Sequence, residues 1–163
     1  MGPLLKLAVD FGIGFLQGYA QAAADQRNQP SFADCMAYLA RETGHRLSMV
    51  REISAWFDIE AGSETYSVVV VLKGDEVSIN AMSNLTFARG RAPSDICEFL
   101  VEHNKTLAHC DFDLLNGTEG DKFIIKAKVR CEALTPTVFE AALREMVPRM
   151  IAFDHVLVQK GYA

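Results

Sequence analysis

The sequence lacks the residue patterns that mark common catalytic and phosphate-binding sites. It contains no G-x-S-x-G motif, no Walker loop and no G-x-G-x-x-G pattern after a predicted strand. The glycines of Gly12-x-Gly14-x-x-x-Gly18 have the wrong spacing and context for a dinucleotide loop. These absences argue against nucleophilic catalysis and nucleotide binding. We expect a protein that is not an enzyme and needs no cofactor.

Positive charge is also scarce. The 163 residues include 16 Lys and Arg against 21 Asp and Glu, which gives a net charge of -5. Proteins that bind nucleic acid normally present a basic face that displaces counterions from phosphates. The composition therefore gives no electrostatic reason to expect nucleic-acid binding.

The four cysteines show no paired spacing. Cys35, Cys97, Cys110 and Cys131 form no C-x-x-C motif, and three of them fall at positions that a core would bury. A chain of this length can bury a stable core without disulfides. We expect reduced thiols.

A short stretch rich in Cys and His leaves a thiol- or zinc-dependent enzyme as a third alternative. Cys97, His103, His109 and Cys110 are residue types that zinc binds. Residues six apart on a helix point to different sides, however, and adjacent residues of a strand face opposite ways. Acidic neighbours of Cys97 also oppose a lowering of its pKa by the helix dipole. We therefore expect inert thiols and no bound metal.

Residues 4–24 are unusually apolar. Lys6, Asp10, Gln17 and Gln21 interrupt the run, so it fits neither a spanning helix nor an export signal well. One apolar stripe repeats at helical spacing: Leu4, Ala8, Phe11, Phe15 and Tyr19.

We expect an amphipathic helix and linker at residues 1–28, before a single domain at residues 29–163. The small residues Gly14, Gly18 and Ala22 are spaced by four and would let this helix lie close to a sheet. The stripe would also fit a membrane surface, which makes a peripheral membrane protein the alternative function. We expect a cytoplasmic location, with an uncleaved export signal as the alternative.

The remaining residues predict an α+β domain with an antiparallel sheet. Ser31 is an N-cap with Asp34 at the capping-box position, and Gly44 ends that helix. Beyond it, apolar and polar residues alternate with a period of two, as strands require. We expect five strands in the order βββ-α-ββ, at residues 47–60, 65–73, 77–87, 108–114 and 122–131.

Two further helices complete the expected domain. Ser94 should cap the helix between the third and fourth strands. Thr135 followed by Pro136 should open the last helix. Pro148 lies inside that helix and should kink or divide it.

Asp111 and Asp113 share one face of a predicted strand, a pattern that acid–base catalysis could use. Lys126, Lys128 and Arg130 share one face of the following strand. Opposite charges across a ladder stabilise a sheet by about 0.2–1 kcal/mol per pair. We therefore expect salt bridges here instead of catalysis.

Apolar side chains also occupy the side of the first three strands that should be polar. A wet sheet face should not carry this much apolar area, so something is expected to cover it. The cover would be the N-terminal helix, a second copy of the chain or a partner protein. The residues expected at this partner-binding surface are Val50, Trp56, Val69, Val71 and Met82.

The second half of the chain carries a resemblance to a known family. Asn104 follows the middle helix, a strand ends in Cys110-Asp111-Phe112-Asp113-Leu114, and Leu134-Thr135-Pro136 precedes a helix with Phe153-Asp154. With the order of elements, this pattern resembles the YbjN family, which is related in fold to type III secretion chaperones, over residues 31–160. The resemblance implies a bacterial, chaperone-like or regulatory interaction module, often homodimeric, without catalytic residues. We therefore expect a homodimer or a complex with a protein client.

Overall fold

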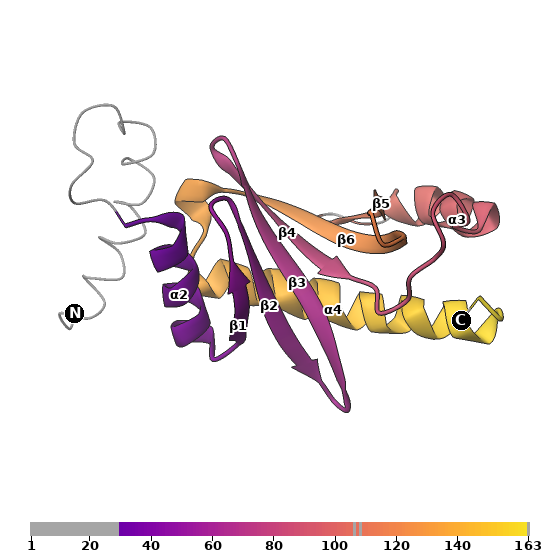
Figure 1. Cartoon of the computed structure of the whole chain (residues 1–163), viewed down its shortest axis with the longest axis horizontal. Coiled ribbons are helices and arrows are strands. Elements are labelled where there is room, and N and C mark those ends of the chain that lie inside the picture. The colour runs from indigo at the N-terminus through magenta and orange to yellow at the C-terminus, as the bar shows by residue number, and fades with distance from the viewer. Residues whose placement is uncertain (1–29, 106, 108, 163) are drawn as a thin grey trace.

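The computed structural model describes residues 30–105, 107 and 109–162, so the helix expected at residues 4–24 lies outside the described residues. The described chain forms one antiparallel sheet of six strands in the order β1-β2-β3-β4-β6-β5 (Figure 1). The strands are β1 (Arg46–Val50), β2 (Ser54–Ala61), β3 (Glu64–Lys73), β4 (Glu76–Met82), β5 (Asp111–Asn116) and β6 (Asp121–Arg130). The described helices are α2 (Phe32–Thr43), α3 (Ser94–Asn104) and α4 (Pro136–Gln159), and a 3-10 turn at Cys131–Ala133 leads into α4.

Helix α4 crosses one face of the sheet, which we call the inner face. Near its start, Phe139 packs against Phe57 of β2 with ring centroids 5.0 Å apart. Near its end, Phe153 contacts Phe112 of β5 at 5.1 Å and Phe123 of β6 at 5.2 Å. In Figure 1 the strands lie in front of α4, which runs behind the sheet. Helix α4 therefore connects β2, near one edge of the sheet, with β5 and β6 at the other edge.

The other helices join the same core from the ends of the sheet. Helix α2 contacts β1, β2 and α4, and α3 contacts β5. The expected capping box of α2 is present, with Ser31 Oγ accepting the Asp34 N–H and Asp34 accepting the Ser31 N–H. Gly44 ends α2 at φ 75°, in the left-handed region that favours glycine. The sequence signals that bound this helix are confirmed.

A buried carboxylate ties α4 to the end of β4. Asp154 is 5% exposed and accepts hydrogen bonds from Ser83 Oγ at 2.5 Å and from the Asn84 N–H at 2.9 Å. Burial raises the pKa of Asp154, and these two hydrogen bonds offset part of that rise. The pair fixes where the helix lies along the strand.

The prediction of a single strand at residues 47–60 is wrong. The chain turns at residues 51–53, where the Arg51 N–H donates to the Ser54 carbonyl at 2.7 Å, and separates β1 from β2. The sheet therefore has six strands and not five. The turn contains no Gly, Pro, Asn or Asp, the residues that normally signal one.

Three smaller expectations also differ. Strand β4 ends at Met82, and Phe87 forms only an isolated bridge to Asp121. Ser94 is the first residue of α3, and the N-cap position belongs to Pro93, which has no side-chain acceptor. Pro148 does not divide α4, which runs unbroken past it. Pro148 is exposed, so water can reach the carbonyl that loses its helical partner.

Candidate functional site

The opposite side of the sheet, which we call the outer face, carries apolar side chains that no described helix covers. The core cluster joins the inner face to buried residues of α2, α3 and α4 and includes none of the apolar residues of the outer face. Figure 1 views the sheet with α4 on the far side. The apolar members of the outer face are Met49, Trp56, Val69, Val71, Met82, Leu115 and Ile124.

Strand register places these residues on one face, where the polar residues Asn80 and Ser78 lie opposite Val69 and Val71. Trp56 lies opposite Met49 on one side and Val69 on the other, and Met82 lies opposite Ile124. Directly opposite residues of antiparallel strands share a face and contact one another. The four residues Trp56, Val69, Val71 and Met82, expected from the sequence, therefore lie on one surface.

Val50 does not belong to that surface. It lies opposite the buried Ala55 and packs against the core, whereas the preceding Met49 lies opposite Trp56 and is 45% exposed. The register shifts between Leu47 and Met49, and this bulge reverses the alternation in β1. Placing Val50 on the outer face was wrong because a bulge leaves no sign in the alternating pattern.

Trp56, on β2, is the largest apolar side chain of the outer face. Its ring is half-buried, and the Arg51 guanidinium stacks over it at 5.2 Å from the centroid. Such a cation–π contact stabilises by about 0.5–1 kcal/mol at an exposed site. Ser48 Oγ donates to the Trp56 carbonyl at 3.2 Å and so fixes the backbone beside the bulge. The bulge and the β1–β2 turn together hold the indole in place.

Charged residues beside the outer face are largely paired. Lys126 Nζ lies 2.5 Å from Asp113 Oδ2, and this hydrogen bond holds the pKa of Asp113 below its usual value. Arg130 Nη2 lies 3.5 Å from Asp75 Oδ2, and its Nε lies 3.5 Å from Glu132 Oε1. Of the salt bridges expected between β5 and β6, the structure shows the one between Asp113 and Lys126, whereas Arg130 pairs with Asp75 and Glu132. Asp111 lies opposite Lys126 in the ladder, but the ion pair goes to Asp113.

Side chains satisfy backbone groups at the β5 edge of the sheet. On β5 the Asn104 side chain accepts the Phe112 N–H at 2.7 Å and donates to the Phe112 carbonyl at 2.8 Å. The Leu114 N–H donates to Asp113 Oδ1 at 2.8 Å. At the other edge, α2 contacts β1. The β5 edge therefore offers fewer free backbone groups to a partner strand.

The Cys and His residues considered for zinc do not form a site. Among residues 30–105, 107 and 109–162, no three His, Cys, Asp or Glu side chains are grouped so that they could hold a metal ion. Burial and then Asp95 raise the pKa of Cys97. Burial and the nearby Glu145 carboxylate, 3.6 Å away, raise the pKa of Cys110 to about 11. Raised pKa values oppose the thiolate form that catalysis needs.

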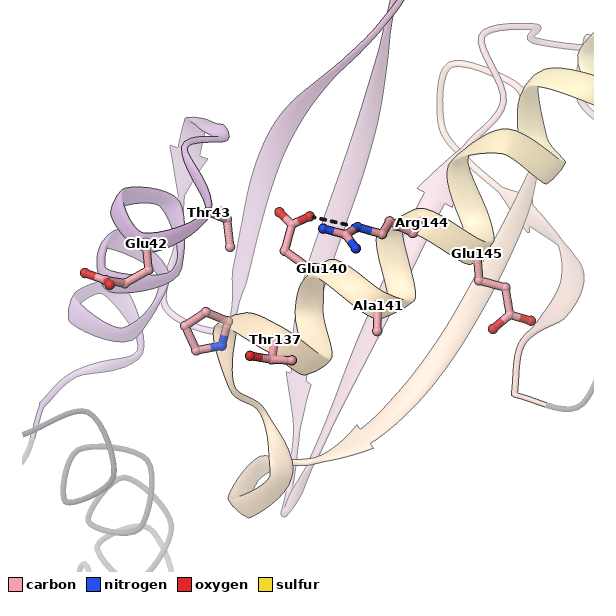
Figure 2. Close-up of a pocket in the computed structure, with 8 residues that line it drawn as sticks. Glu42, Thr43, Thr137, Glu140, Ala141, Arg144 and Glu145 are labelled. Atoms are coloured by element: carbon pink, nitrogen blue, oxygen red, sulfur yellow. Dashed lines mark ion pairs between the residues drawn. The ribbon is translucent and has the colours of Figure 1, made fainter. Parts of the chain in front are cut away.

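An open groove of about 630 Å³ lies between the end of α2 and the start of α4 (Figure 2). Glu140 pairs with Arg144 at 3.8 Å, and its other oxygen lies 2.6 Å from His45 Nε2. Figure 2 shows Glu42 and Glu145 at opposite ends, away from this pair. The carboxylates do not converge on a common point, so the groove offers no arrangement for acid–base chemistry.

Some residues of the outer face were not expected from the sequence. Ile124 is 7% exposed and lies between Met82 of β4 and Asp113 of β5. Its position among Lys122, Lys126 and the other even-numbered residues of β6 could have indicated the same face. Met49 could not have been found in this way, because its position depends on the bulge.

No protein-family model matches the sequence, and no curated protein matches it. The fold is similar to the crystal structure of YbjN from E. coli, a protein proposed to be a transcription regulator, with a TM-score of 0.55 and 11% sequence identity. The similarity covers 80% of this chain and 93% of YbjN. The resemblance to the YbjN fold and the α+β class are confirmed. In the described part of the chain, every helix is too short or too polar to cross a membrane.

Proposed function

We propose that this protein is a non-catalytic binding module that holds an apolar segment of another protein chain on the outer face of its sheet. The observation that carries the proposal is the grouping of Trp56, Val69, Val71 and Met82 on a side that no described helix covers. Burial of apolar area contributes about 25 cal/mol per Å² and needs no covalent step.

The chemistry of the face favours protein over nucleic acid. Trp is among the residues enriched at the centres of protein interfaces, where it anchors binding. The basic residues Lys126 and Arg130 have acidic neighbours, and the net charge is -5. Because Asn104 occupies the β5 edge at Phe112, docking on the face is favoured over extension of the sheet at that edge. YbjN is proposed to be a regulator, and regulation through protein contacts is compatible with this proposal.

Site-specific photocrosslinking tests the proposal in the native host. A benzophenone amino acid at Val69 should give a defined crosslinked protein, either a client or a second copy of the chain. The same group at Arg144, exposed on α4, is the matched control and should not give that product. Trp56→Lys should abolish the Val69 product.

Equal crosslinked products from Val69 and Arg144 would contradict the proposal. So would a Val69 product that still forms in the Trp56→Lys variant. Sedimentation of the purified chain over a range of concentrations then identifies the homodimer case. A second copy on the outer face requires association that Trp56→Lys weakens.

A further inference from the structure

We infer that the outer face binds helix α3 of a second copy of this chain. The inference rests on the proposed function, because it names the occupant of that same face. It commits to this one pair of surfaces, and a different protein on the outer face would overturn it.

The exposed side of α3 is acidic and carries apolar side chains that the monomer leaves unburied. Asp95, Glu98 and Glu102 are exposed there. Phe99 and Val101 flank these acidic residues and are 50% and 61% exposed. Figure 1 shows α3 at the opposite end of the described chain from α2. An acidic helix with apolar flanks is therefore available to another molecule.

A basic row borders the apolar residues of the outer face. Lys126, Lys128 and Arg130 share the outer side of β6. Lys128 lies opposite Ser78 of β4, which in turn lies opposite Val71 of β3. Lys128 is exposed and forms no ion pair with residues 30–105, 107 and 109–162, unlike its two basic neighbours. The outer face therefore offers an unpaired cation two strands away from its apolar residues.

The acidic residues of α3 match the spacing of this row. Glu98 and Glu102 are one helical turn apart, which is about 6 Å along the axis. Lys126 and Lys128 are about 6.7 Å apart along β6. A helix that lies along β6 can therefore bring both carboxylates to both ammonium groups. Glu98 and Lys128 are the decisive pair, because Glu98 also has no ion pair within the described part of the chain.

Phe99 supplies the apolar part of the contact. It lies beside Glu102 on the helix surface, since three positions separate them. A helix is about 10 Å across, and two strand spacings place Lys128 about 10 Å from Val71. With Glu98 on Lys128, one direction of the helix therefore brings the Phe99 ring onto the valines of β3. The contact would combine an ion pair with burial of apolar area on both copies.

Exchange of the two charges tests this pairing in the full-length chain. Sedimentation should show that Lys128→Glu and Glu98→Lys each raise the dissociation constant for self-association about tenfold, because an attraction becomes a repulsion. The double variant should recover most of the loss, since opposite charges then face each other again. Arg144→Glu and Glu42→Lys are the matched controls. They make the same changes of charge on exposed residues of α4 and α2 and should leave association unchanged, singly and together.

The single tryptophan of the chain, Trp56, provides a second readout, because its fluorescence reports on the outer face alone. Higher protein concentration should shift its emission to the blue and weaken quenching by acrylamide, and Lys128→Glu should suppress both changes. A benzophenone amino acid at Val69 provides a third readout. In a mixture of isotope-labelled and unlabelled chains, it should crosslink to residues 94–104 of the other copy.

The inference is overturned if the purified chain stays monomeric, or if the double variant associates no better than the single variants. It is also overturned if association leaves the Trp56 emission unaltered, or if Val69 crosslinks to a client protein instead of α3. A client product that Trp56→Lys abolishes leaves the proposed function standing. Products that do not depend on Trp56 contradict the proposed function itself.

Discussion

The Asn104 side chain takes the place of a neighbouring strand at Phe112. Its amide satisfies both the N–H and the carbonyl that Phe112 presents at the free edge of β5. We predict that Asn104→Ala exposes this edge. Two lost hydrogen bonds should lower the free energy of unfolding by about 1–3 kcal/mol, and the variant should associate at concentrations where the wild type does not.

Urea denaturation and sedimentation measure the two effects. Asn116→Ala is the matched control because Asn116 is an exposed residue of β5. If Asn104→Ala unfolds and sediments as the wild type does, the edge is not protected by this side chain.

The raised pKa of Asp154 predicts a pH dependence of stability. Burial is its first cause, so the folded state binds the proton more tightly than the unfolded state, whose pKa is near 3.8. The stabilisation is complete below 3.8 and is lost as the pH rises through the folded pKa. Relative to Asp154→Asn, the wild type should therefore lose stability across this window and show no further change above it.

Asp113 provides a control of opposite sign. Its hydrogen bond with Lys126 lowers the pKa of the carboxyl below 3.8 in the folded state. Its stabilisation is present above 3.8 and disappears as the pH falls through the folded pKa. Urea denaturation from acid to neutral pH should show Asp154→Asn and Asp113→Asn diverging from the wild type in opposite directions; parallel curves would contradict both assignments.

The thiols should be unreactive in the folded protein. Burial raises the pKa of Cys35 to about 12 and that of Cys110 to about 11, and it also raises those of Cys97 and Cys131. Since only the thiolate attacks a disulfide reagent, all four should react slowly at neutral pH and rapidly in denaturant. Reaction of Cys97 at the rate of a free thiol would contradict this prediction and favour thiol chemistry.

Substitutions on the two faces of the sheet should differ in their effect on the free energy of unfolding. Phe139 is fully buried against Phe57, and Phe139→Ala should cost about 3–5 kcal/mol of unfolding free energy. Trp56→Ala removes a larger side chain but leaves no core cavity, so its cost should be clearly smaller. Arg144→Ala on the exposed face of α4 should stay within about 0.5 kcal/mol of the wild type. Equal losses for Trp56→Ala and Phe139→Ala would place Trp56 in the core.

Local chemistry explains how much of the fold the sequence could predict. Ser31 and Thr135 carry side-chain oxygens that accept helix N–H groups, and their caps are where we expected them. The turn at residues 51–53 was missed because Arg, Glu and Ile carry no turn preference, and tertiary pairing of β1 with β2 decides it. The helix expected at residues 4–24 lies outside the described residues.

The candidate surface was predictable as far as strict alternation holds. Trp56, Val69, Val71 and Met82 follow the period of two along β2, β3 and β4. Met49, and not Val50, lies on the outer face because of a single bulge at Ser48. This bulge is a property of strand pairing and not of composition. Which residues lie on a sheet face can thus be predicted only after the register of the paired strands is known.

A core confined to one side of the sheet divides the strand positions into two sets that differ in how tightly they are packed. Inward residues such as Phe57 and Ile79 must keep their volumes, since α4 packs on them. Outward residues such as Trp56 and Val69 lie outside that core, so their replacement should cost less stability. The fold shared with YbjN at 11% identity shows that this architecture persists through extensive changes of sequence.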